Sequence, residues 1–159
     1  MKISISISHE ECLYEAGLKI ASLAETYDFA QHTISQDLMQ QYWEQCGRDA
    51  DIMLSRYRIT PCRPNLHGNY TAVLRMPRAY DNGLAPALSS LLFSYFTAFV
   101  AAEAITYIAP PTSMQHTEKE ISLQKVVDSL RTERDTLRQR IITMLNIRRG
   151  PVRRRMTFS

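Results

Sequence analysis

The feature that most limits the possible folds is a run of 21 residues, positions 82 to 102, without a charged side chain. A helix of that length can cross a membrane. The run also contains Pro86 and several hydroxyl residues, and no cluster of basic residues borders it to orient a membrane helix. Its apolar residues surround the helix rather than forming one stripe, which is typical of an element packed on several sides. We therefore expect a buried central helix, starting near Asp81, and no membrane span.

The N-terminal part of the sequence is consistent with a single domain that packs around that helix. A chain of 159 residues, 45% of them hydrophobic, is long enough to bury one core. Ile3, Ile5 and Ile7 alternate with serines, which predicts a strand with one buried face. The period then changes, and apolar residues that include Leu18 predict a first amphipathic helix over residues 10–24.

The next segment predicts a helix, a loop and a second strand. The sequence TISQ at residues 33–36 has the form of a helix-capping box, and apolar residues at three- and four-residue steps extend the predicted helix to about Tyr57. Prolines and turn formers follow. Alternation over residues 70–76 predicts a strand, with residues 56–60 as a candidate hairpin partner. We expect the loop between them, about residues 59–72, to project from the body.

The last predicted helix begins at a second capping box, TEKE at residues 117–120, and runs to Asn146. At 1.5 Å per residue it would be about 45 Å long, longer than the expected width of its own domain. Either its apolar stripe belongs to the chain's own core, or the stripe packs on another subunit. The spacing is heptad-like, and the candidate inter-subunit seam comprises Leu123, Leu130, Arg134 and Leu137.

These elements predict an α+β fold that is mostly α: a bundle of about four helices with a small β element, formed by the N-terminal strand and a hairpin or loop. Residues 1–147 form one helical domain in this prediction, and residues 148–159 form a basic C-terminal tail. Gly150 and Pro151 end the last helix and mark that boundary.

Charge is distributed unevenly along the chain. Residues 1–117 contain 8 Lys+Arg and 11 Asp+Glu, whereas residues 118–159 contain 11 and 5, so the net charges are −3 and +6. From residue 138 to the end there are seven arginines and no acidic residue. Arginine forms forked hydrogen bonds with carboxylates and phosphates, so the tail is suited to an acidic partner. No sequence of a nucleic-acid reading module accompanies it, which favours a protein partner over DNA or RNA.

The sequence predicts no catalytic or metal centre. The four histidines lie at element boundaries without a second ligand at metal spacing, and no phosphate loop or nucleophile motif is present. Asp49 and Asp51 are two residues apart on a helix and therefore do not share a face, so we expect them to be solvated. Three widely spaced cysteines indicate a reducing compartment. We expect a protein that is not an enzyme and binds no cofactor or metal.

The order of these elements and the residue patterns within them resemble a known family. The sequence RDADIMLSRY at residues 48–57, an extended loop, LAPALSSLLFSYF at residues 84–96 and a final helix with a basic extension resemble the head-tail adaptor (connector) proteins of tailed bacteriophages. The chain is also similar to small virion proteins of phages that infect Bacteroidetes. The strand at residues 3–7 and the length of the final helix depart from the usual adaptor pattern.

The resemblance implies a structural virion protein that forms a homo-oligomeric ring of about twelve subunits beneath the portal. It implies that the protein lies in the neck or tail of the virion, and in the host cytoplasm during assembly. It also implies a possible contact with DNA in the channel. The implied contacts with the portal are Arg148, Arg149, Arg153, Arg154, Arg155 and Phe158. The implied loop tip, which reaches a neighbouring subunit, comprises Asn65, Leu66, His67, Asn69 and Tyr70.

Three alternatives remain open at this point. The chain could be another neck or tail protein of a phage, because such proteins would show the same residue patterns in their helices. It could be a small nucleic-acid-binding regulator that uses its arginine-rich tail, which predicts DNA affinity with a steep dependence on salt. It could also be an enzyme with a concave site around His9 or His67, although no motif indicates one.

Overall fold

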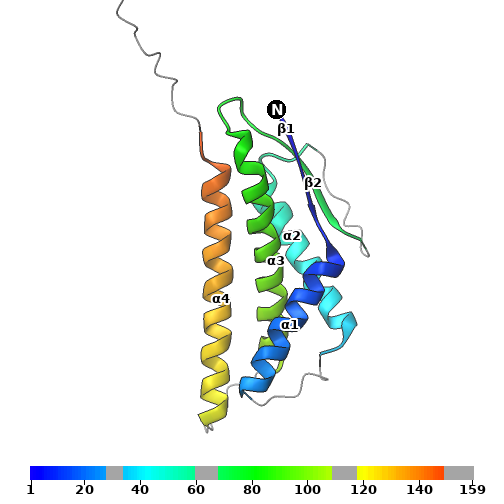
Figure 1. Cartoon of the computed structure of the whole chain (residues 1–159), viewed down its shortest axis with the longest axis vertical. Coiled ribbons are helices and arrows are strands. Elements are labelled where there is room, and N and C mark those ends of the chain that lie inside the picture. The colour runs from blue at the N-terminus through cyan, green and yellow to red at the C-terminus, as the bar shows by residue number, and fades with distance from the viewer. Residues whose placement is uncertain (28–33, 60–67, 109–117, 149–159) are drawn as a thin grey trace, which may run out of the picture.

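The computed structural model describes residues 1–27, 34–59, 68–108 and 118–148. Within these residues the chain is mostly helical, with a small antiparallel sheet, so the predicted fold class is confirmed (Figure 1). In chain order the elements are β1 (Lys2–Ile7), α1 (His9–Tyr27), α2 (Gln36–Leu54), β2 (Tyr70–Arg75), α3 (Ala85–Ile108) and α4 (Glu118–Leu145).

Helix α3 is the central element, as the uncharged run predicts. It contacts α1, α2, α4 and β1. With the preceding turn, Asn82–Leu84, it is the one described segment that is long and apolar enough to cross a membrane. Its apolar residues nevertheless face other parts of the same chain, and ten of them are buried. The helix is therefore the core of a helical bundle, because each of its partners covers a different side.

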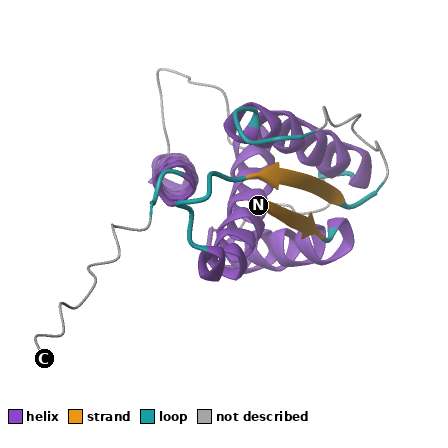
Figure 2. Cartoon of the chain, turned by 90° about the horizontal axis from the view of Figure 1, so that it is seen from above, coloured by secondary structure: helices purple, strands orange, loops and turns teal. Residues whose placement is uncertain are grey.

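The two strands form an antiparallel pair, which confirms that the N-terminal strand pairs with a later one. Ile3 lies opposite Leu74, and Ile7 lies opposite Tyr70. The isoleucines and the alternate residues of β2 are buried, whereas the serines point outward. Figure 2 shows the two strands side by side, with α4 seen almost end-on at the left edge.

The predicted hairpin partner of β2 contributes a single bridge rather than a third strand. Arg58 lies opposite Leu74. The Ile59 amide donates to the Val73 carbonyl at 3.1 Å, and the Arg75 amide donates to the Tyr57 carbonyl at 2.6 Å. These contacts hold residues 57–59, which follow α2, against the edge of β2 that does not pair with β1.

The helix ends follow capping chemistry, with one change from the sequence prediction. Helix α2 is capped by Ser35, whose hydroxyl accepts from the Leu38 amide at 3.1 Å, and Thr33 lies outside the described residues. Asp81 caps the turn before α3 by accepting from the Gly83 amide at 3.0 Å. In both places a short polar side chain satisfies a backbone N–H that has no partner within its helix.

The core has two parts, which α3 joins. One part packs the sheet and α2 against the first half of α3 and the last turns of α4. The other packs α1 and the first half of α4 against the second half of α3. Leu18 was predicted to belong to the buried stripe of α1, and that prediction is wrong: its side chain is 49% exposed.

Candidate functional site

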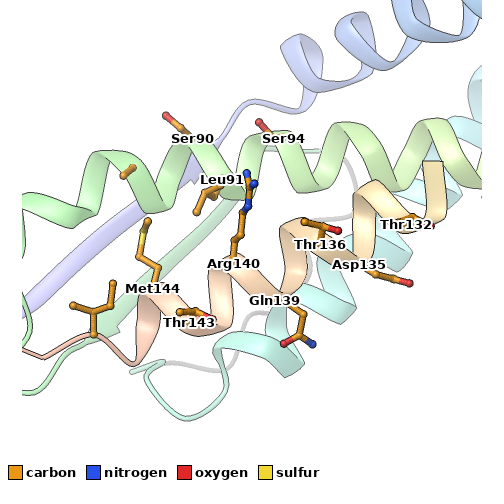
Figure 3. A pocket seen from close by; sticks show the side chains of 12 residues that line it. Ser90, Leu91, Ser94, Thr132, Asp135, Thr136, Gln139, Arg140, Thr143 and Met144 are labelled. Atoms are coloured by element: carbon orange, nitrogen blue, oxygen red, sulfur yellow. The ribbon is translucent and has the colours of Figure 1, made fainter. Parts of the chain in front are cut away.

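The main candidate site is a groove between the first half of α3 and the second half of α4. It has a volume of about 940 Å³ and a largely apolar lining. Figure 3 shows Leu91 of α3 and Met144 of α4 facing each other across it. The groove is lined by Ala87, Ser90, Leu91, Ser94, Thr132, Asp135, Thr136, Gln139, Arg140, Thr143, Met144 and Ile147. We call this feature the α3/α4 groove.

Two charged side chains of α4 give the groove its polarity. Asp135 is bound by the neighbouring Arg134, with 3.3 Å between Nε and Oδ1. Arg140 extends from α4 toward α3 beside Leu91 (Figure 3). Arg140 is exposed, and no carboxylate of the described residues pairs with it. The groove therefore presents one positive charge that is available to an incoming carboxylate.

A partly buried polar contact fixes the wall of the groove that α4 forms. The Tyr95 hydroxyl donates to Asp49 of α2, and Arg138 donates to the same carboxylate oxygen at 3.3 Å. Burial and the hydrogen bond to Asp49 raise the pKa of Tyr95 above its ordinary value, so the hydroxyl remains a donor. This Asp49 clasp ties α2, α3 and α4 together directly beneath the groove.

A second clasp lies two residues further along α2, on a different face of the helix. Asp51 accepts from the Tyr70 hydroxyl at 2.8 Å and pairs with Arg58 at 2.7 Å. The Arg58 side chain is almost fully buried, and its Nε and Nη2 atoms have no hydrogen-bond partner among the described residues. Asp49 and Asp51 were predicted to be solvated; both are partly exposed, at 29% and 23% of their side chains, and each carboxylate is also held by other side chains.

The residues of the predicted inter-subunit seam of α4 lie against other parts of the same chain. Leu123 and Leu130 are buried in the core with α1 and α3, and Leu137 packs against the other part of the core. Arg134 binds Glu103 of α3 at 3.2 Å and lies over the Phe99 ring, 5.5 Å from its centroid. Among the described residues the stripe therefore packs in the chain's own core, one of the two alternatives that the sequence left open.

Two of the predicted loop-tip residues lie within the body of the protein. Tyr70 is the first residue of β2; it is buried, and its ring packs on Phe96 at 5.0 Å between centroids. Asn69 accepts from the His9 amide at 3.1 Å and so caps α1. Residues 70–72 therefore belong to the sheet and not to the predicted projecting loop. Asn65, Leu66 and His67 lie outside the described residues.

One of the predicted portal-binding arginines is engaged within the chain. Arg148 donates to the carbonyls of Leu145 and Ile147 at 2.9 and 3.0 Å, and to the Tyr57 hydroxyl at 3.3 Å. It thus caps the C-terminal end of α4, where a cation is favourable. Arg149, Arg153, Arg154, Arg155 and Phe158 lie outside the described residues.

The side chains of His9, Cys12 and Cys46 make contacts within the chain, and His9 also lines a second hollow of about 740 Å³. His9 shares a hydrogen bond with the amide of Gln40 and packs edge-on against Trp43, with 5.0 Å between ring centroids. Burial raises the pKa of Cys12 to about 11, and burial also raises that of Cys46, so both thiols are protonated at neutral pH. No group of three metal-ligating side chains occurs in the part of the chain that the structure describes.

Comparison of the chain with protein-family models, with curated proteins and with solved structures gives no match. The candidate site therefore rests on the geometry of the α3/α4 groove.

Proposed function

We propose that this chain is a structural virion protein of a tailed phage, a subunit of the head-tail adaptor or neck ring that links the portal to the tail. The observation that supports an assembly role is the open α3/α4 groove. Largely apolar surfaces that the chain itself leaves uncovered mark contacts with other macromolecules, and a groove between two helices is suited to a helix from another protein.

A protein partner fits the groove better than a small molecule does. Small-molecule sites enclose most of the ligand's surface and point several polar groups at one position. Here the lining hydroxyls follow the two helices, from Thr132 to Thr143 on α4 and at Ser90 and Ser94 on α3. A long lining of this kind matches an elongated partner, and Arg140 supplies one point of specificity within it.

The place of the arginine-rich residues supports contact with the portal. They follow α4 directly in the sequence, and the Asp49 clasp and Arg148 fix the final turns of that helix. All chains of a ring would therefore direct these residues toward the same side. The remaining proposed portal contacts are Arg149, Arg153, Arg154, Arg155 and Phe158, and the proposed loop contacts with a neighbour are Asn65, Leu66 and His67.

The test is to mix the purified chain with the portal protein of the same phage genome and to measure the mass of the complex. We expect about twelve copies per portal ring. The triple variant Arg153→Glu, Arg154→Glu and Arg155→Glu should not bind. The matched control reverses three exposed arginines of the body, Arg48→Glu, Arg75→Glu and Arg78→Glu, and should bind normally.

Two results would contradict the adaptor proposal. One is a chain that does not bind the portal under any salt condition. The other is tight binding to duplex DNA that weakens steeply with salt and disappears when residues 149–159 are removed, because that behaviour defines the nucleic-acid-binding alternative.

A further inference from the structure

Helix α1 carries an apolar ridge on its outer face. Tyr14 is 66% exposed and Leu18 is 49% exposed. They are four residues apart, so they lie one above the other on the same face of the helix. Exposed Glu11 and Glu15 border them. We call Tyr14 and Leu18, with these two acids, the α1 ridge.

The α3/α4 groove is complementary to the α1 ridge in apolar character and in charge. The groove has a largely apolar lining, and Tyr14 and Leu18 are exposed apolar side chains, each at a smaller hollow. The groove contains Arg140, and its one acidic residue, Asp135, already pairs with Arg134. The ridge is flanked by two carboxylates. An apolar contact with an ion pair at its border is the usual composition of a protein interface.

The ridge cannot reach the groove of its own chain. Residues of α1 share a core with the first half of α4, and Lys19 binds Glu133 at 2.9 Å. Glu133 lies between the groove residues Thr132 and Asp135 along α4, so these contacts hold α1 beside the middle of α4, at one end of the groove. A smaller hollow of about 430 Å³, lined by both Leu18 and Ser94, lies between the ridge and the groove. A ridge that fills the groove must therefore come from another molecule.

We propose that the α1 ridge of one copy docks in the α3/α4 groove of a second copy, with Tyr14 and Leu18 on the apolar lining and Glu11 or Glu15 paired with Arg140. The proposal rests on the assembly role argued above and names the partner of the groove. The two surfaces differ, so each added copy leaves one ridge and one groove uncovered. Copies add in one direction until the ring closes.

The experiment uses two variants that each disable one surface. The ridge variant is Tyr14→Glu with Leu18→Glu, and the groove variant is Ala87→Arg with Ser90→Arg, two groove residues that do not line the hollow beside Leu18. All four positions are exposed, so both variants should keep the helical circular dichroism of the unmodified chain. Native mass spectrometry should show several copies for the unmodified chain and one copy for each variant alone. Each surface should lose roughly a hundredfold in affinity, since two central apolar side chains or their pocket are removed.

Mixing the two variants supplies the decisive observation. The ridge variant keeps a working groove, and the groove variant keeps a working ridge, so an equimolar mixture should form a species of two copies and nothing larger. As the control, Ile52→Glu changes a side chain that is 68% exposed on α2 and should assemble like the unmodified chain. Arg140→Glu alone should weaken assembly, and adding Glu11→Arg with Glu15→Arg should restore it.

Three outcomes would overturn the docking proposal. A mixture of the variants that stays at one copy excludes contact between ridge and groove. A ridge variant that assembles like the unmodified chain shows that the groove binds something else, including a second groove in a symmetric pair. A chain of one copy at every concentration excludes contact between copies, and binding to the portal then tests the proposed function separately.

Discussion

The contact between α3 and α4 has two halves of opposite character, although the same two helices form both. In the closed half, apolar side chains bury one another without a groove; they are Val100, Ala101, Ala104 and Ile105 of α3, and Leu123, Val126, Val127 and Leu130 of α4. In the open half, small and hydroxyl side chains line the α3/α4 groove together with Leu91, Met144 and Ile147.

The difference depends on whether α1 covers the contact, as well as on which residues α3 and α4 contribute to it. In the closed half α1 packs on both helices, with Ala16 and Ile20 in the same cluster. In the open half no described element covers the surface between α3 and α4. A helix pair that lacks a third partner leaves surface for another chain, and hydroxyl side chains suit such a surface because they tolerate both water and contact with protein.

The largest expected effect on stability comes from a substitution that disrupts the packing of the closed half. Val127 is 1% exposed, so Val127→Asp would bury a carboxylate that has no partner. We expect a loss of about 4 kcal/mol or more in the free energy of unfolding, measured by urea denaturation. Thr136→Asp is the matched change in the open half and should alter that free energy by less than about 0.5 kcal/mol. Equal losses would contradict the division into two halves.

A smaller effect should come from removing the clasp beneath the open half. Asp49→Ala leaves the Tyr95 hydroxyl, in a side chain 1% exposed, without its acceptor. We expect a cost of about 1–3 kcal/mol in unfolding free energy. Asp135→Ala removes a carboxylate from the groove itself, where water can solvate the remaining groups, and should cost less than about 0.5 kcal/mol. An unchanged stability of the Asp49 variant would show that the clasp does not hold α4.

The same clasp predicts a loss of stability at high pH. The pKa of Tyr95 is raised in the folded chain by burial and by Asp49, so the fold favours the neutral hydroxyl. The stabilisation is complete below the unfolded pKa of about 10 and falls as pH rises above it. Tyr95 alone should contribute a slope of about 1.4 kcal/mol per pH unit. Urea denaturation of the chain and of Tyr95→Phe should show a shallower slope for the variant; a slope identical in both would contradict the raised pKa.

The fold was largely predictable because periodicity reports burial directly. The isoleucine and serine alternation identified β1, and the uncharged run identified α3 as the core helix. Long-range contacts were not predictable in this way. Asp49 looked solvated because its partners Tyr95 and Arg138 lie 46 and 89 residues away.

The candidate site could not be predicted from the same signals. The last helix has one apolar stripe, and the sequence does not say whether α3 or another subunit covers it. The ridge was missed because Leu18 fits the apolar stripe of α1 in sequence, yet faces outward in the structure. The hydroxyl residues of the groove were missed because small polar side chains also occur on any solvated helix face. Whether these side chains are covered or exposed depends on the relative positions of α1, α3 and α4, which the sequence does not give.

The most direct test of the central claim, that the open half of the α3–α4 contact is an assembly surface, is the native mass of the unmodified chain over a series of concentrations. We predict discrete species that grow with concentration toward a closed assembly of about twelve copies. We also predict that Ala87→Arg with Ser90→Arg leaves only single copies. A chain that stays at one copy at every concentration, and also when the portal ring is added, would contradict the account.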